Sequence, residues 1–451
     1  MISHRSYPLD HFDPARLFWT LFPEGPGFFD SASRAPRTGR FSIVPLKCAE
    51  TYSLDEAGLR CRHGGEETIW QGDPFRRLEE IFNARRQRGT AELPIAGGFF
   101  GFLAYDLAWW IEDLPRRAAR DFPTPALWLT WVERCAVYDH DARLLYLASI
   151  DGSDPADWQE PVLQALAADF PEEEFSADPA RPDLRIRQFT AMVRRAKAYI
   201  AAGDIYQANL SCRFVTACRG SSSTLYRRLR AVNPSPFACY VQAPGIEIIS
   251  SSPERLVSLR GACAETRPIA GTRRRGVSNS QDRELGDELL AHPKERAEHV
   301  MLIDLERNDL GKVCRAGSVQ VDELMVLERY SHVTHIVSNV RGELESGYGP
   351  FALLRAMFPG GTITGVPKKR CMEIIEELEP TGRTTYTGSA GYISVTGETD
   401  FNILIRSFQR AGKRLTFQAG AGIVADSDPD REWQECIAKG AAMQKALEVI
   451  E

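Results

Sequence analysis

The pattern that most constrains the fold of this chain is a repeated change between strand and helix periods over residues 185–451. In IYQANLSCRF, residues 205–214, apolar and polar side chains alternate, which predicts a β-strand. From Phe189 to Ile200 apolar residues recur at helical spacing, and Gly203 follows as a stop signal. The same patterns predict strands at 384–395, 401–408 and 415–424, and helices at 283–291, 294–309, 367–378 and 430–449. Such a mixture predicts an α+β fold with sheets packed under helices.

A change in composition divides the chain into two regions. Residues 151–184 are acidic and rich in proline, and they predict a surface linker that contains one short helix. The linker separates an N-terminal region, residues 1–150, from a C-terminal region, residues 185–451. The N-terminal region is predicted to consist of strands and turns with a few helices, because its apolar stretches are short and lie between turn residues.

The composition narrows the class of protein. The net charge of −6 over 451 residues argues against a nucleic-acid partner. No apolar run reaches the roughly 18 to 20 residues that span a bilayer. The first residues lack the pattern of a signal peptide, so we expect no membrane association. The ten cysteines include no CxxC pair, so we expect reduced thiols in a cytoplasmic protein without a zinc site.

The last predicted helix carries Glu432, Glu435 and Lys439 on one face, because residues three, four and seven apart align. Ser427 or Asp428 is a natural N-cap. Two carboxylates and an ammonium group on one stripe could hold a hard cation and an anionic ligand together. The alternative is an exposed helix with an intrahelical salt bridge.

Glu298 lies on another predicted helix and could add a third carboxylate to this set, or it could be a charged surface residue. Oxygen ligands of this kind suit Mg²⁺, which keeps some of its waters and accepts a substrate carboxylate.

Four further segments could carry chemistry, each with a structural alternative. Residues 358–370, FPGGTITGVPKKR, form a glycine-rich turn before a helix, which is either an anion site or a plain helix start. Arg406 lies in an apolar predicted strand and needs either a ligand carboxylate or a structural ion pair. Gly420 and Gly422 share a strand face, which indicates close approach of a ligand or of a helix. Glu254 follows a turn and could be a general acid.

Taken together, these segments resemble the chorismate-utilising enzyme family. The matching segments are DIYQANLS, SSPERL, RPIAGTRRRG, HPKERAEHVMLIDLERNDLG, ERYSHVTHIVSNVRG, FPGGTITGVPKKRCMEIIEELEP, YTGSAGYIS, NILIRS and QAGAGIVADSDPDREWQE. The N-terminal segment FFDSASRAPRTGRFSIV is also similar to the family, and it places Ser31 where a serine can line a tryptophan pocket. The resemblance implies two packed antiparallel β-sheets flanked by helices.

The resemblance also implies a role for each matching residue. Glu298 and Glu435 would bind Mg²⁺ with Glu432 beside them, and the ion would neutralise the ring carboxylate of chorismate. The positions that would hold the two substrate carboxylates are Tyr386, Arg406, Gly420 and Lys439. His335 and Thr362 would line the ring and the departing hydroxyl, and Glu254 would protonate that hydroxyl.

Two positions bear on the nucleophile. Family members that add water carry a lysine base where this chain has Gln207, and a glutamine cannot accept a proton at neutral pH. The resemblance therefore favours ammonia. Ala270 replaces the lysine of the PIKGT motif that many members forming 4-amino-4-deoxychorismate carry, so ammonia would have to attack C2 directly. IDLERNDLG, GGTITGVPK, NILIRS and GGFFGFLAYDL nevertheless favour that product, and anthranilate is the alternative.

The resemblance further implies a partner. No glutaminase domain is recognisable in the chain, so ammonia would come from a separate glutamine amidotransferase subunit. A rival of another class is a non-catalytic protein that keeps the fold and an amino-acid pocket. That pocket would lie around Ser31 and the NPSPF segment, residues 233–237.

Overall fold

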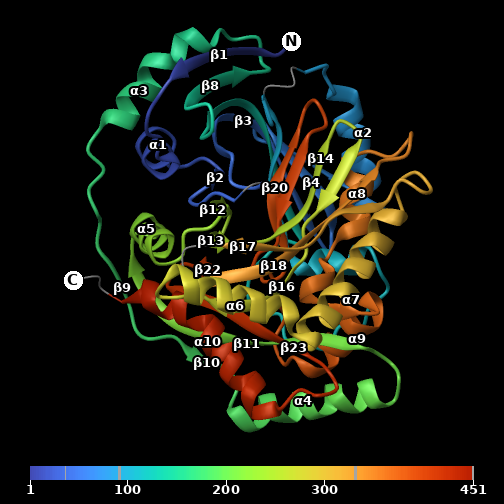
Figure 1. Cartoon of the computed structure of the whole chain (residues 1–451). Coiled ribbons are helices and arrows are strands. Elements are labelled where there is room, and N and C mark those ends of the chain that lie inside the picture. The colour runs from blue at the N-terminus through green and yellow to red at the C-terminus, as the bar shows by residue number, and fades with distance from the viewer. Residues whose placement is uncertain (36, 90–92, 330–332, 449–451) are drawn as a thin grey trace.

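The computed structural model describes residues 1–35, 37–89, 93–329 and 333–448 (Figure 1). Every pairing between its named strands is antiparallel, and helices cover the sheets, so the predicted α+β class is confirmed.

The longest strand pair, β3 (Phe41–Asp55) with β7 (Leu127–Asp139), forms the spine of the molecule. Register shifts between Pro45 and Glu50 mark β-bulges, which let this pair coil. β8 (Leu144–Ser149) and β1 (Ser3–Pro8) extend the spine on one side, and β4 (Gly58–His63) with β5 (Glu66–Trp70) on the other.

Two wings of strands leave this spine. The first, called here the β11 wing, runs through β2 (Gly27–Asp30), β12 (Phe237–Ala243), β13 (Ile246–Ser252), β22 (Ser407–Ala411), β23 (Arg414–Ile423) and β11 (Gln207–Gly220). The second, called the β18 wing, runs through β6 (Gly98–Leu103), β20 (Ser389–Ser394), β21 (Thr399–Asn402), β14 (Arg255–Arg260), β15 (Cys263–Thr266) and β18 (Val333–Glu343). In this wing β18 also pairs with β16 (Ile269–Arg274) and with β17 (Gln320–Arg329). The two expected sheets are therefore joined by hydrogen bonds into one network.

Both wings combine strands from the two halves of the chain. β2 pairs with β12 and β6 pairs with β20, so N-terminal strands complete sheets that C-terminal strands continue. The predicted linker contains one α-helix, α3 (Gln159–Ala167), as expected, after the 3₁₀ turn Pro155–Trp158. Its last residues form β9 (Phe175–Ala177) and β10 (Arg181–Pro182), which pair with β11. The boundary at 151–184 stays a prediction.

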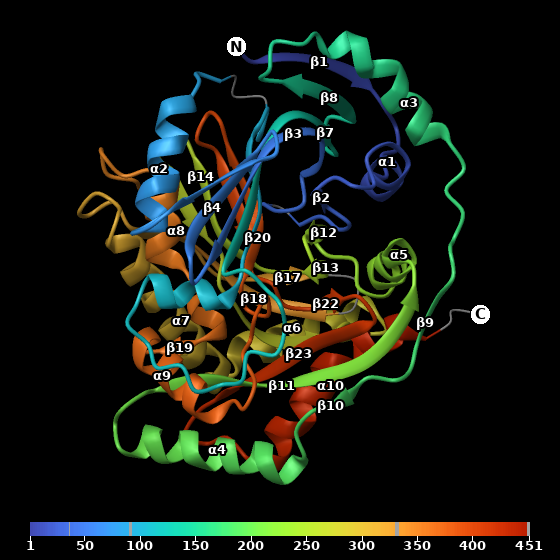
Figure 2. The same cartoon turned by 180° about the vertical axis from the view of Figure 1, so that it is seen from behind.

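Helices cover the outer faces of the two wings. α4 (Ile186–Ala201), α5 (Ser222–Val232) and α10 (Pro429–Leu447) lie against the β11 wing (Figure 1). α2 (Pro74–Arg85), α7 (Pro293–Gly311) and α8 (Pro350–Met357) lie on the side of the β18 wing, which Figure 2 shows from behind. The remaining helical elements are α1 (Pro14–Leu21), α6 (Asn279–Ala291), α9 (Lys368–Leu378), and the 3₁₀ turns η1 (Tyr105–Trp110) and η3 (Gly361–Ile363), with the short strand β19 (Gly365–Val366) before α9.

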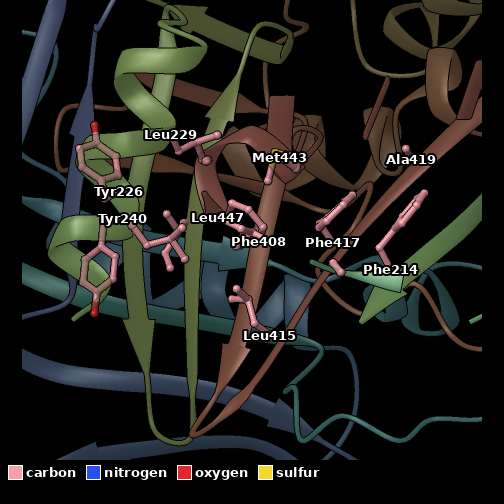
Figure 3. Packing of buried hydrophobic residues seen from close by; sticks show 14 of the residues in the cluster. Phe214, Tyr226, Leu229, Tyr240, Phe408, Leu415, Phe417, Ala419, Met443 and Leu447 are labelled. Atoms are coloured by element: carbon pink, nitrogen blue, oxygen red, sulfur yellow. The ribbon is translucent and has the colours of Figure 1, made fainter. Parts of the chain in front are cut away.

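The hydrophobic core of the β11 wing holds α10 against the sheet. Phe214 and Phe417 face each other across β11 and β23, with ring centroids 4.7 Å apart. Met443 and Leu447 of α10 join Phe408 and Leu415 in the same cluster (Figure 3). Burying each of these side chains stabilises the fold by roughly 1.5 to 3 kcal/mol. Gly440 lets the helix come close, because a Cβ there would lie 3.2 Å from the Phe417 ring. This packing fixes where α10 places its polar face.

The predicted helices are confirmed, with ends that differ by a few residues. Asp428 is the N-cap of α10 and accepts hydrogen bonds from the amides of Asp430 and Arg431. The predicted strand at 401–408 is wrong, because β21 ends at Asn402 and β22 begins at Ser407. Among the described residues no helix is both long and apolar enough to cross a membrane.

Candidate active site

The polar face of β11 meets two glycines of β23. In the antiparallel register Asn209 faces Gly422, and Ser211 faces Gly420. A Cβ at Gly420 would lie 2.5 Å from Asn209 Oδ1 and 3.0 Å from the Tyr386 hydroxyl. A Cβ at Gly422 would lie 2.5 Å from Gln207 Nε2. The two glycines thus make room for polar side chains of neighbouring residues. The close approach that the glycines predicted is therefore made in part by these side chains.

Lys439 connects α10 to this surface. Its ammonium group donates a hydrogen bond to the carbonyl of Gly420 at 3.1 Å and forms an ion pair with Glu435 at 2.6 Å. The intrahelical salt bridge that the sequence left open is therefore present. It does not exclude a ligand, because the Lys439 side chain keeps 40% of its surface exposed.

Arg406 lies in the break between β21 and β22, where its φ of +53° ends the extended conformation. Its guanidinium donates a hydrogen bond to the carbonyl of Lys439. Burial lowers the pKa of Arg406, and the neighbouring Tyr386 opposes that shift. In the described part of the chain no carboxylate forms an ion pair with Arg406. Among these residues a structural ion pair, one of the two alternatives, is thus absent, and the half-buried cation is available to a ligand carboxylate.

Glu254 lies between β13 and β14, directly before β14, with 6% of its surface exposed. Burial raises the pKa of its carboxyl to about 7, while contacts with Thr362 and the Ile269 backbone and the charge of Lys439 oppose the rise. A carboxyl that keeps its proton near neutral pH is suited to act as a general acid. Thr362 lies in η3 beside it, so the structure brings these two residues together, and their roles stay predictions.

His335 and Ala270 lie on neighbouring strands of the β18 wing. His335 Nδ1 is 3.0 Å from the Thr272 hydroxyl, and Ala270 pairs with Ile336 before a β-bulge. Burial, together with the charges of Arg406 and Lys439, lowers the pKa of His335 to about 4, while the Gly271 carbonyl opposes the shift. The imidazole is therefore neutral at pH 7. The bulge places residue 270 between Ile269, which contacts Glu254, and Gly271, which contacts His335.

Glu432 of α10 lies near enough to Glu298 of α7, and Glu435 near enough to Glu432, to affect its charge. Burial raises the pKa of Glu298, and the neighbouring Glu295 and Glu432 add to the rise. Burial and the charge of Glu435 raise the pKa of Glu432 in the same way. A divalent cation would relieve this repulsion, so the donor set fits Mg²⁺. Within the described residues no three acidic, histidine or cysteine side chains enclose a metal position by themselves, so a ligand carboxylate and waters would complete the coordination.

Ser31 lies in a different place, at the junction of β2 with the two wings. The cavity beside it has a volume of 60 Å³ and is lined by residues that include Arg37, Phe237, Tyr392 and Asn402. The hydroxyl of Ser31 donates to the Phe41 carbonyl at 2.7 Å. A volume of this size holds about two water molecules. The cavity is therefore too small for tryptophan in this conformation, and its regulatory role stays a prediction.

Gln207 was predicted to lie in the site, whereas Asn209 was not. Both side-chain carbonyl oxygens, Gln207 Oε1 and Asn209 Oδ1, are buried and lack a hydrogen-bond partner among the residues that the structure describes. The strand period could have revealed Asn209, because it is two residues from Gln207 on the same face. Its unpaired oxygen marks it as a further candidate for ligand contact.

Comparison with known proteins assigns this chain to a protein family. The family model described as chorismate binding enzyme matches residues 37–445. Aminodeoxychorismate synthase component 1 of Bacillus subtilis is 44% identical, covering 92% of this chain and 91% of its own length. Anthranilate synthase component 1 of Thermus thermophilus is 41% identical, covering 97% and 96%. The crystal structure of anthranilate synthase component I from Streptococcus pneumoniae superposes with a TM-score of 0.80 at 32% identity, covering 91% of this chain and 93% of that one.

The chain therefore belongs to the chorismate binding enzymes. Chorismate carries two carboxylates, which agrees with the two cationic side chains, Arg406 and Lys439, that meet at Gly420 and Tyr386. The roles given above to individual site residues stay predictions. Relatives bearing two different activity names match over nearly the whole chain, so the comparison defines the family but not the product.

Proposed function

We propose that the chain is an aminodeoxychorismate synthase component I, which catalyses the Mg²⁺-dependent amination of chorismate with ammonia to 4-amino-4-deoxychorismate, the precursor of 4-aminobenzoate in folate biosynthesis. The observation that carries the proposal is the pair Glu254 and Gln207. Glu254 can donate a proton near pH 7, whereas Gln207 faces the site and cannot activate a water molecule. The Bacillus subtilis relative that bears this name supports the choice of product.

In the proposed mechanism Arg406, Lys439, Tyr386 and the backbone of Gly420 hold the two carboxylates of chorismate and so position the ring. Magnesium, held by Glu298, Glu432 and Glu435, would neutralise the ring carboxylate when bound. Glu254 protonates the C4 hydroxyl, which leaves as water while ammonia forms a bond to C2. In a second displacement another ammonia forms a bond to C4 while the amino group leaves C2 as ammonia, and the enolpyruvyl group is kept. Neutral His335 and Thr362 line the path of the departing hydroxyl.

In the cell, the ammonia would come from a separate glutamine amidotransferase subunit, as the words "component 1" in the name of the Bacillus subtilis relative suggest for that protein. All ten cysteine thiols are free, which agrees with a reducing compartment, and we propose the cytoplasm.

Anthranilate synthesis is the second candidate, favoured by Ala270. An alanine beside Glu254 and His335 supplies no lysine nucleophile, so a mechanism through a covalent lysine adduct is not open to this chain. The relative from Thermus thermophilus carries the anthranilate synthase name. This reaction would share the amination at C2 and then eliminate pyruvate.

Product analysis decides between the two candidates. The purified protein is incubated with chorismate, Mg²⁺ and an ammonium salt at mildly alkaline pH, and the products are identified by mass spectrometry. We expect an aminated product that retains the enolpyruvyl group and yields 4-aminobenzoate when a lyase is added. Anthranilate with pyruvate would establish the second candidate. Calorimetric titration with tryptophan tests whether the Ser31 cavity opens to bind an amino acid, as the non-catalytic alternative would require.

A further inference from the structure

Arg383, in the loop that follows α9, is a buried arginine that the proposed mechanism does not use. Its exposed fraction is 2%, and every nitrogen of its guanidinium donates a hydrogen bond. Glu379 accepts two of these bonds, from Nε at 2.9 Å and from Nη2 at 2.8 Å, and also accepts bonds from the amide and the hydroxyl of Ser211. Replacing a buried ion pair with apolar side chains is often neutral for stability or stabilising, so stability alone does not explain this pair.

Two further hydrogen bonds of Arg383 reach backbone carbonyls in different parts of the site. Nη2 donates to the Asn209 carbonyl of β11 at 2.7 Å, and Nη1 donates to the Ile363 carbonyl of η3 at 2.8 Å. Ile363 directly follows Thr362, which contacts Glu254. One guanidinium therefore joins the polar face of β11 to the 3₁₀ turn that borders the predicted general acid.

The same arginine begins a strained turn, residues 383–387, that carries Tyr386. Thr384 and Thr387 have φ angles of +53° and +62°, in the left-handed region that residues other than glycine rarely adopt. The Arg383 carbonyl accepts a hydrogen bond from the Tyr386 amide at 2.9 Å, and its Nη1 donates to the Thr387 hydroxyl at 3.4 Å. Backbone strain of this kind persists only where the surrounding contacts hold it, and it is frequent at functional sites.

These contacts connect the two ends of the site. Glu254 and Thr362 form the end at which the hydroxyl would leave. Tyr386 lies at the other end, where Gly420 and Lys439 would hold a carboxylate. The ring of chorismate fixes the separation between its C4 hydroxyl and its carboxylates, so the two ends of the site have to keep a matching separation. A displacement of about 1 Å in such a site can lower the rate by about 100-fold.

We propose that Arg383 is a positioning residue, which sets the separation between the acid end of the site at Thr362 and the carboxylate end at Tyr386. It acts through hydrogen bonds to the protein on both sides and not through contact with the substrate. The inference rests on the proposed amination of chorismate, because the acid end matters only if the C4 hydroxyl leaves. A lysine would keep the charge opposite Glu379, but its single nitrogen lacks the rigid fork that holds two carbonyls in place.

The test is the kinetics of Arg383→Lys, measured from about pH 6 to about pH 9 with the concentration of free ammonia held constant. We expect kcat for chorismate amination to fall by about 30- to 100-fold, because the two ends no longer keep their separation. We also expect the alkaline decrease of kcat to begin at a higher pH than in the wild type. Burial raises the pKa of Glu254 and the contact with Thr362 opposes the rise, so a displaced η3 would let that pKa rise further.

Arg213→Lys is the matched control. Arg213 is also on β11, is 5% exposed, and forms a bidentate ion pair with Asp121 at 2.7 and 3.0 Å and a hydrogen bond to Asp183 at 2.9 Å. Both substitutions should lower the melting temperature, because each disrupts a buried ion pair. Arg213→Lys should nevertheless keep kcat within about threefold of the wild type and leave the alkaline decrease in place.

Thr387→Gly is a second variant that does not disturb the ion pair. Glycine adopts a φ of +62° without strain, so the change frees the turn at the carboxylate end and leaves η3 in place. We expect the KM for chorismate to rise by about three- to tenfold while the alkaline decrease of kcat stays where it is in the wild type. If Arg383→Lys does not fold, an unchanged KM in Thr387→Gly overturns the proposal.

The outcomes separate this inference from the proposed function. A folded Arg383→Lys protein with the kcat of the wild type would overturn the positioning role and leave the function standing. A lower kcat with an unmoved alkaline decrease would indicate a structural role and would likewise overturn it. If the wild type forms no aminated product at all, the proposed function falls and this inference falls with it.

Discussion

At the scale of single residues, the site depends on groups whose burial changes what they can do. Glu254 is a glutamate whose pKa of about 7 comes from removal from water. A general acid works only while protonated, so its contribution should be complete well below pH 7 and should decrease as the pH rises through about 7. The fraction of ammonia that is unprotonated rises with pH instead. The pH optimum of the amination is therefore set by both effects together.

Replacing Glu254 with glutamine removes the proton donor and keeps the shape. We expect kcat for chorismate amination to fall by roughly 10² to 10⁴ while the KM for chorismate changes little. Steady-state kinetics at several pH values measure both. A Glu254→Gln variant with full activity would show that another group protonates the leaving hydroxyl.

Arg406 gives a prediction about stability as well as binding. A half-buried guanidinium without a carboxylate costs folding free energy, so Arg406→Met should raise the free energy of unfolding of the free protein by about 1 kcal/mol. The same change should weaken chorismate binding by about 10- to 100-fold, because a charged hydrogen-bonding partner is lost.

Denaturant unfolding and calorimetric titration measure these two effects. Arg219→Met is the matched control, since Arg219 is exposed on β11, and it should change neither quantity. A less stable Arg406→Met protein would mean that the charge is compensated in the free enzyme.

At the scale of elements, β23 and α10 hold the site in register. Gly420→Ala would place a methyl group 2.5 Å from Asn209 Oδ1 and 2.9 Å from the Leu210 carbonyl. Because the backbone of β11 cannot move without breaking the β11–β23 ladder, we expect a loss of stability of about 1 to 3 kcal/mol and a marked loss of activity. Gly311→Ala, at the end of α7 with open space around it, is the control and should be neutral or slightly stabilising.

Hydrophobic periods were sufficient to predict these elements and the face that carries Gln207, and residue type limited the N-cap of α10 to Ser427 or Asp428, of which Asp428 is used. They failed at 401–408, where the apolar run looked like one strand. The break between β21 and β22 depends on the positive φ of Arg406 and on the hydrogen bond from the Ile405 amide to the Ile403 carbonyl. The hydrophobic pattern of the sequence indicates neither feature. The burial of Glu306 was also hidden, because it sits in the charged sequence DLERND, where helical period alone does not show which side chains are covered.

At the scale of the whole molecule, the two regions of the chain share strands of the same sheet network and a hydrophobic core. Phe100 and Phe102 of β6 pack with Cys239 and Ile248 of the β11 wing, so the core between the wings needs both halves of the sequence. We expect the full chain to unfold in a single transition and residues 185–451 alone not to unfold cooperatively, because β12 and β20 would lose the partners β2 and β6.

Circular dichroism during heating tests this expectation, and co-expression with residues 1–184 should restore the transition. An isolated C-terminal fragment with a sharp transition and chorismate affinity of its own would instead establish it as an independent domain.

The uncompensated charge of Arg406 has a consequence for the life of the protein in the cell. A ligand carboxylate supplies the partner that the polypeptide lacks, so the loaded enzyme opens less often than the empty one. Proteases act on opened chains, and the rate at which they remove a protein follows how often it opens. The abundance of this enzyme would then rise when its substrate is plentiful and fall when it is scarce, without any change in the synthesis of the protein.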